Sequence, residues 1–286
     1  MTSILTNNSA MNALSTLRNI NNSLGNTQDR ISTGLKVASG KDNAAYFAIS
    51  STMKGDSGMT KAIDEGLTLT KNSVSTGRLG AETVADLARQ FVDRVAFAQA
   101  EGVDLAKVQE ELTELVGRMN TSIEQSTFNG SSAIAAVAGT AETVTVVTGI
   151  ARDSAGALST TSFTYDKADL RTVTAALGAI DVVTAGADPL TSAGLLETAL
   201  QTAETNLALA VDGATSLGIA EKSIETQQSF LGELSKRLDS GIGSMIDADM
   251  ESEAARLQAL QVQQQLATQA LSIANQGPQN ILSLFR

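Results

Sequence analysis

The most constraining feature of this sequence is a series of apolar residues at heptad spacing that runs from Leu196 to Met245. Alternate steps of four and three residues from Leu196 visit 15 positions, and 12 of these are apolar. A seam of this length is typical of coiled-coil packing. A continuous helix over this stretch would be about 75 Å long, at a rise of about 1.5 Å per residue. The sequence therefore predicts a long helical rod, and Gly241 and Gly243 predict a hinge or break that ends it.

Two further segments show helical spacing. A second seam predicts a helix from about residue 105 to residue 123, with Asp104 as its N-cap and Asn129-Gly130 as a turn after it. Residues 41–100 also read as helical, although glycines thin the pattern there.

The middle of the chain has a different pattern. Residues 143–150 and 158–166 are rich in Thr, Val and aromatic residues, which predicts two strands joined around Asp153 to Gly156. A short helix is expected over residues 169–180, followed by a loop to Pro189. We interpret residues 136–189 as a small mixed or β insertion in a helical chain.

The two ends of the chain carry very few charges. Residues 1–35 contain Arg18, Asp29 and Arg30, and residues 257–285 contain no charged side chain. Both ends have apolar residues at helical spacing, and the C-terminal end has them on two sides. We expect these apolar residues to form contacts between identical chains. The candidate residues are Leu14, Leu17, Ile20, Leu24 and Ile31 at one end, and Leu257, Leu260, Leu266, Leu271 and Ile273 at the other.

Composition excludes several functional classes. The 286 residues include no Cys, His or Trp, so disulfides, thiolate nucleophiles and imidazole metal ligands are absent. A net charge of −11 argues against nucleic acid as a partner, because phosphate binding needs clustered Lys and Arg. A membrane-spanning C-terminal helix is also rejected, since eight Gln amides in residues 257–285 would be unsatisfied in lipid. The chain begins without the pattern of a cleaved signal peptide.

Two local patterns have a functional and a structural interpretation. The acidic residues at 247, 249, 251 and 253 could bind a metal, but we favour Asp247 or Asp249 as a helix N-cap with glutamates in the first turn. Lys41-Asp42 could be a catalytic pair, but a solvated or interface salt bridge is the better interpretation, since neither a nucleophile nor a pocket accompanies it. We therefore expect no catalytic, cofactor or metal site.

The two ends resemble bacterial flagellin. The N-terminal resemblance lies in residues 30–36, RISTGLK, and 39–45, SGKDNAA, and the run 127–130, TFNG, follows the first helical region. The C-terminal run 274–286, ANQGPQNILSLFR, is similar almost letter for letter. The resemblance covers about residues 1–135 and 195–286.

This resemblance implies a mainly α fold, with a long antiparallel coiled-coil bundle, paired terminal helices and the small insertion. It implies an inner tube made of residues 1–40 and 250–286, a layer of long helices made of 41–135 and 190–249, and an outer insertion of 136–189. The implied function is that of a secreted subunit that self-assembles into the extracellular filament for motility. The implied partners are further copies, an export chaperone, the export apparatus, and the cap and junction proteins of the filament.

Three rival functions follow from other interpretations. A hook–filament junction protein has similar ends but acts as an adaptor in few copies. An exported protein with amphipathic helices could insert into host membranes, although the Gln-rich end argues against lipid. An enzyme is the third rival, and the absence of His and Cys disfavours it.

Overall fold

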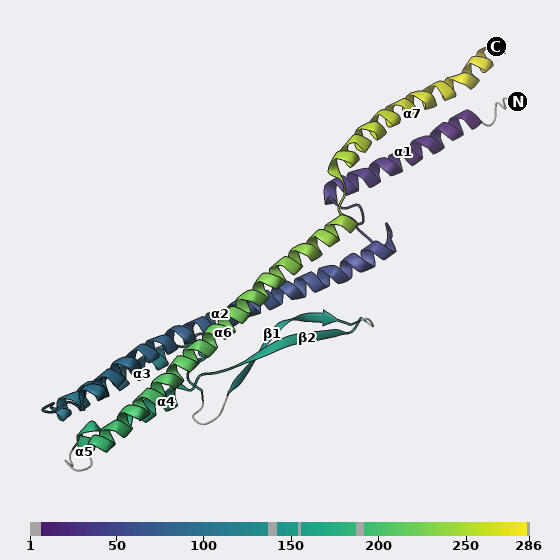
Figure 1. The fold of residues 1–286 in the computed structure, drawn as a ribbon. Coiled ribbons are helices and arrows are strands. Elements are labelled where there is room, and N and C mark those ends of the chain that lie inside the picture. Colours follow the sequence, from purple (N-terminus) through teal and green to yellow (C-terminus); the bar gives the residue numbers. More distant parts are fainter. Residues whose placement is uncertain (1–6, 137–141, 154–155, 187–191, 285–286) are drawn as a thin grey trace. The chain divides into compact units, whose positions relative to one another are not determined.

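The computed structural model describes residues 7–136, 142–153, 156–186 and 192–284. Within these residues the elements in chain order are seven helices and one hairpin: α1 (Asn8–Thr33), α2 (Ala44–Phe97), α3 (Leu105–Gln125), β1 (Thr143–Arg152), β2 (Leu158–Asp166), α4 (Leu170–Gly178), α5 (Val182–Gly186), α6 (Ser192–Ile246) and α7 (Met250–Leu284) (Figure 1). This confirms a mainly α fold with a small β insertion.

The chain divides into two compact units. The terminal unit comprises residues 1–57 and 236–286, and the long-helix unit comprises residues 58–235. Helices α2 and α6 each contribute one part to each unit.

The long-helix unit has one apolar core, built largely from heptad positions. Every seventh residue of α6 from Leu196 to Leu231 is buried, as the sequence pattern predicted, and the intervening seam residues Leu200, Leu207 and Ala214 pack against the same core. Helix α3 contributes its whole predicted seam, and Asp104 caps it by accepting hydrogen bonds from the backbone N–H groups of residues 106 and 107. Small and aliphatic side chains fill most of this core. Phe91 is the one aromatic residue among its buried described members, and the sequence contains no Trp.

The middle segment shares this core. Helices α4 and α5 pack on α3, and Leu170, Val173 and Leu177 are buried in the same cluster as α2 and α6. Polar contacts fix the packing: the Thr174 hydroxyl donates to Asn120 Oδ1 at 2.8 Å, and the backbone N–H of Val182 donates to Gln109 Oε1 at 2.9 Å. The predicted loop from residue 181 to Pro189 is wrong at its start, because residues 182–186 form helix α5. Burial of Val182 in the core and hydrogen bonds from the backbone N–H groups of Val183 and Thr184 to Asp181 Oδ1 stabilise this turn of helix. Residues 187–189 lie outside the described part of the chain.

The two predicted strands form an antiparallel hairpin. The register pairs Thr143 with Asp166 and Arg152 with Leu158, with an irregularity between Val147 and Gly149. One face of the hairpin is covered, since Val146 is buried, and the other face is exposed. Glutamine 227 of α6 donates from Nε2 to the carbonyl of Thr148 at 2.8 Å. Two residues of the expected connection, 154 and 155, lie outside the described part of the chain.

The Asn129-Gly130 turn is confirmed. Both residues have positive φ, 50° and 77°, which is the backbone conformation that the two central residues of a type I′ turn require. Phe128 and Ser131 exchange two backbone hydrogen bonds across it, at 2.8 and 3.0 Å. This turn leads the chain from α3 to Ala133 and Ile134, which are buried in the core.

The predicted break at Gly241 and Gly243 is wrong. Helix α6 continues through both glycines and ends at Ile246. The neighbouring Ile242 and Ile246 are buried in a small apolar cluster with Val37. Burial of these side chains offsets the helix-propensity cost of about 1 kcal/mol for each glycine. Tertiary packing therefore overrides the local preference.

Glycine 80 of α2 permits a close approach that the sequence pattern did not reveal. A Cβ atom there would lie 2.0 Å from Ser126 Oγ and 2.8 Å from Ile134 Cδ1. Glycine 66, in the same helix, has open space around the corresponding position. A side chain at residue 80 would therefore clash, whereas a side chain at residue 66 would not.

We expect Gly80→Ala to lower the free energy of unfolding by about 1–3 kcal/mol, because α2 must move away from the segment after α3. The matched control Gly66→Ala should raise it by about 0.5–1 kcal/mol, since it improves helix propensity without a clash. Urea unfolding followed by circular dichroism measures both. Equal stability of the two variants would show that the close approach at Gly80 is not required.

Candidate assembly surfaces of the terminal unit

Helices α1 and α7 pair antiparallel along a seam. Asparagine 7 donates from Nδ2 to the carbonyl of Ala274 at 2.8 Å, and at the other end Arg30 Nη1 lies 3.0 Å from Glu253 Oε1. Between them, the side-chain amide of Gln264 donates to Asn21 Oδ1 at 2.8 Å. Residue numbers rise on α1 as they fall on α7, so the pairing is antiparallel (Figure 1).

The seam follows alternate steps of three and four residues on both helices. On α7 the covered or partly covered positions are Glu253, Leu257, Leu260, Gln264, Ala267, Leu271 and Ala274. On α1 they are Ala10, Ala13, Leu17, Ile20, Leu24, Thr27 and Ile31, together with flanking Asn7, Ser23, Gly25 and Arg30. This is the spacing of a two-stranded coiled coil.

Thr27 is the most buried residue of α1, at 2% exposure, and it is not among the predicted interface residues because it is polar. The heptad steps from Ile20 through Leu24 to Ile31 do pass through this position. A strict heptad reading could therefore have identified it.

A second stripe on α7 is open. It comprises Val262, Leu266, Ala270 and Ile273, all of which are exposed. Leu266 is 58% exposed and Ile273 is 70% exposed. At about 100° per residue, this stripe faces away from the seam with α1. In the described single chain, it has no partner helix.

The ten candidate interface residues therefore fall into two groups. Three are exposed, namely Leu14, Leu266 and Ile273. The others line the seam between α1 and α7 of the same chain: Leu17, Ile20, Leu24, Ile31, Leu257, Leu260 and Leu271. Whether any of them lies between copies stays a prediction.

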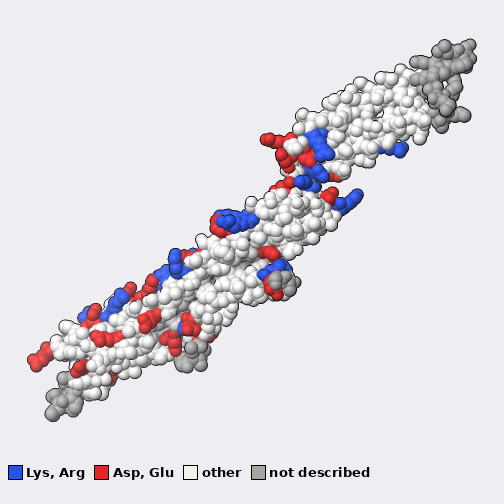
Figure 2. Space-filling view, turned by 45° about the vertical axis from the view of Figure 1, so that its right-hand side comes forward, with Lys and Arg blue, Asp and Glu red and all other residues white. Residues whose placement is uncertain are grey.

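Charge is distributed unequally between the two units. By sequence, the terminal unit carries nine Lys or Arg and eight Asp or Glu, whereas the long-helix unit carries 11 and 23. Figure 2 shows α1 and α7 as an almost uncharged surface on the face in view. Copies of the terminal unit can therefore approach one another with little electrostatic repulsion.

The acidic residues before α7 are part of a helix start. Asp249 Oδ1 accepts hydrogen bonds from the backbone N–H groups of Glu251 and Ser252, at 3.1 and 3.2 Å. Glu251 and Glu253 lie in the first turn, where the helix dipole favours them. The described residues contain no group of three or more acidic side chains arranged to hold a metal ion. The N-cap interpretation is confirmed for Asp249.

The connection between α1 and α2 is held by backbone hydrogen bonds, both within it and to the residues around the end of α6. Gly34 ends α1 with φ 71°, and its N–H donates to the carbonyl of Arg30 at 2.8 Å. The next residues pair with the end of α6 and the residues after it, since Lys36 N donates to the carbonyl of Ile246 at 2.6 Å and Ala248 N donates to that of Gly34 at 2.8 Å. Leu35 and Val37 pack in the small cluster with Ile242 and Ile246.

Asp42 fixes the loop before α2. Its Oδ2 atom accepts hydrogen bonds from the backbone N–H groups of Ala38 and Ser39 and from the Ser39 hydroxyl, at 3.0 to 3.2 Å. The bond from the Ser39 hydroxyl, followed by that from the Ser39 backbone, lowers the pKa of this carboxyl. Asp42 therefore acts as a loop cap.

No helix among the described residues is long and apolar enough to span a lipid bilayer.

Comparison with known proteins identifies the family. Residues 4–138 match the bacterial flagellin N-terminal helical region, and residues 198–285 match the bacterial flagellin C-terminal helical region. A flagellin of Brucella melitensis biotype 1 is 39% identical over the full length of both chains. Flagellin C of Rhizobium meliloti is 34% identical over the full length of both. Flagellin FljM of Caulobacter vibrioides is 32% identical over all of this chain and 99% of its own.

The chain belongs to the bacterial flagellin family. It is a structural subunit of the flagellar filament, which is an extracellular assembly of many copies. These matches do not favour the alternative of a hook–filament junction protein.

We expect Asp42→Asn to lower the midpoint of thermal unfolding at pH 7. A carboxyl with a depressed pKa stabilises the fold above its ordinary pKa of about 4, and this contribution is lost as the pH falls through the depressed value. The difference between the wild type and the variant should therefore shrink below about pH 4 and vanish at lower pH. Calorimetry from pH 2 to pH 7 measures it, and a difference that is constant with pH would contradict the capping role.

Proposed function

We propose that copies of this chain assemble into the filament through the open stripe of α7, Val262, Leu266, Ala270 and Ile273. The observation that carries this proposal is the exposure of the stripe on a helix whose last 28 described residues, 257–284, include no charged side chain. When a second copy covers an apolar stripe of this kind, burial stabilises the contact by about 25 cal/mol per Å² of apolar area. The exposed Met11 and Leu14 of α1 offer further apolar surface of the same unit.

In this proposal different parts of the chain form three layers of the filament. Residues 1–40 and 250–286 form the inner tube, residues 41–135 and 190–249 form the layer of long helices, and residues 136–189 lie outermost. The end of α1 at Thr33 and the start of α7 at Met250 support the first boundary. The low charge of the terminal unit supports its place where copies are most crowded.

The partners of the proposal follow from the family. An export chaperone and the export apparatus deliver the subunit without a cleaved signal peptide. Cap and junction proteins contact the filament at its two ends. The role is structural and not catalytic. The absence of Cys and His in the sequence supports this, because it removes the usual thiol and imidazole groups of catalysis.

Leu266→Asp should abolish filament growth while the subunit is still produced and remains helical. An unpaired carboxylate at a contact between copies costs several kcal/mol, so addition of each subunit becomes unfavourable. The measurement is electron microscopy after seeding with filament fragments, with circular dichroism on the same sample.

Gln261→Asp is the matched control, because Gln261 is exposed on the same helix but lies outside the stripe. It should polymerise. Normal filaments from Leu266→Asp would refute the assignment of this stripe, and equal failure of both variants would show that any charge on α7 blocks assembly.

We also expect the terminal segments to order on assembly, because the seam between α1 and α7 leaves apolar surface exposed in a single chain. Limited proteolysis should then remove residues near both ends from the monomer faster than from the filament. Equal resistance in a proven monomer would contradict this expectation.

A further inference from the structure

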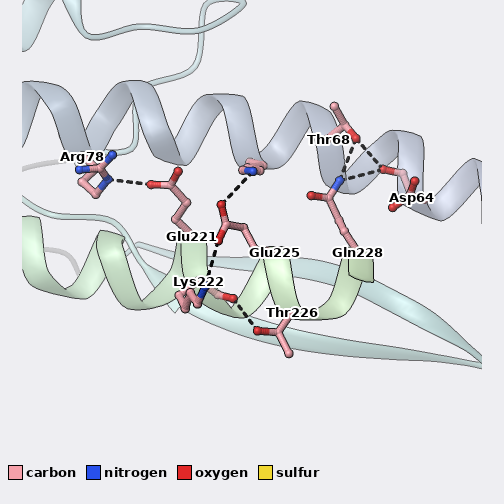
Figure 3. Close-up of polar contacts among 9 residues, drawn as sticks. Asp64, Thr68, Arg78, Glu221, Lys222, Glu225, Thr226 and Gln228 are labelled. Atoms are coloured by element: carbon pink, nitrogen blue, oxygen red, sulfur yellow. Dashed lines mark hydrogen bonds and ion pairs between the residues drawn. The ribbon is translucent and has the colours of Figure 1, made fainter. Parts of the chain in front are cut away.

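Helices α2 and α6 of the long-helix unit are joined on one side by a ladder of polar contacts. Arg78 Nε lies 2.7 Å from Glu221 Oε2, and Gln228 Nε2 donates to Thr68 Oγ1 at 2.8 Å (Figure 3). Between these two contacts, Lys71 Nζ lies 3.0 Å from Glu225 Oε1. The order of the contacts shows that the helices run antiparallel.

One member of this ladder is unfavourable by itself. Asp64, Lys71 and Arg78 are spaced by seven residues on α2, so they occupy equivalent positions. Gln228 donates to the backbone carbonyl of Asp64 at a long 3.5 Å. The carboxylate oxygen Oδ1 of Asp64 is buried and has no hydrogen-bond partner among the described residues. A buried acceptor without a partner lowers stability.

The apolar seam distinguishes one register from the next only by the volumes of its side chains, because every seventh position of the seam is apolar. Between positions 196 and 231 of α6, every seventh residue is Leu, Ala or Ile. A slip of one heptad moves α6 by about 10 Å along α2, yet it again places apolar residues against the core of α2. A polar interaction that differs between registers would add to this selection.

The polar ladder does distinguish the registers. A slip in one direction brings Glu221 to the place of Gln228, beside Asp64. It also leaves Arg78 and Lys71 opposite Ala214 and Gly218. Two ion pairs are then lost, and one carboxylate approaches another, which is repulsive.

A slip in the opposite direction is penalised by the ion pairs alone. It places Gln228 opposite Arg78 and Gly232 opposite Lys71, while the small hydroxyl of Ser235 takes the place of the Gln228 amide. Neither basic residue then has an acidic partner on α6.

We infer that this ladder fixes the register of α6 on α2, and that Asp64 is its repulsive member, which blocks the slip that would bring Glu221 beside it. A polar residue at a core-flanking position commonly specifies register at a cost in stability. This role gives a physical reason for the buried Asp64 Oδ1 atom that has no hydrogen-bond partner among the described residues. The inference concerns the single chain and is independent of how copies meet in the filament.

The absence of native cysteine allows a direct measurement of register. Nitroxide labels on Asn72→Cys and Ser216→Cys, both exposed positions, report the distance between the helices by double electron–electron resonance in the monomer. Residue 216 lies about two helical turns from the level of residue 72. The slip toward Glu221 therefore shortens the distance, and the opposite slip lengthens it.

The labelled wild type should show one distance. Lys71→Glu with Arg78→Glu should add a population of more than about 20% at a longer distance, because Glu221 and Glu225 now repel α2 in the native register. Adding Asp64→Ala should add a shorter distance as well, since the barrier to the other slip is removed.

Two further variants make the test decisive. Adding Glu221→Lys and Glu225→Lys to the reversed pair rebuilds the ladder with opposite charges and should restore the single distance. Lys107→Glu with Arg118→Glu makes the same change of charge in pairs within α3 and should leave the distance unchanged.

A folded Lys71→Glu, Arg78→Glu protein with only the wild-type distance would overturn the inference. So would an equal change in the α3 control. If the reversed pair unfolds the chain, recovery of the fold and of the single distance by the fourfold exchange supports the ladder, and failure of that exchange overturns it.

Discussion

The structure depends on the packing of antiparallel helices through narrow apolar seams. In the long-helix unit the seam of α6 is made of Leu, Ala and Ile at every seventh position, and in the terminal unit α1 and α7 meet at the same spacing. Seams of this kind need few large side chains, because each residue fills a gap between neighbours on the facing helix. They also leave the outer faces of the helices free for other copies, which a filament subunit requires.

The two units differ in their charge and in the polar contacts that join their helices. The long-helix unit carries most of the net negative charge, and its ion pairs connect neighbouring helices, as between Arg78 and Glu221. In the terminal unit α1 and α7 carry few charges, and the amides of Gln264 and Asn21 connect the two helices beside the single ion pair of Arg30 and Glu253 that the described residues show between them. Amides satisfy one another in any copy, whereas charges of one sign repel, so the terminal unit, whose net charge is close to zero, is the better surface for repeated contact.

Apolar periodicity and polar contacts specify different properties of the fold. Periodicity determines which faces of α2 and α6 meet, but it repeats every seven residues and so leaves the register undetermined. The ladder around Asp64, Lys71 and Arg78 does not repeat in this way. It selects one register at a cost in stability, which is visible as the buried carboxylate oxygen of Asp64.

The sequence by itself determined the long helices, the two strands, the Asn129-Gly130 turn, the cap at Asp104 and the family, because these follow from periodicity, local hydrogen bonding and specific runs of residues. Only the tertiary structure decided where α6 ends and which face of α7 is covered. Helix α6 passes through Gly241 and Gly243 because Ile242 and Ile246 are buried there. The two apolar stripes of α7 cannot be distinguished by sequence pattern. In the structure α1 covers one stripe, and Leu266 and Ile273 of the other are exposed. Only the position of the partner helix distinguishes a seam from a free surface.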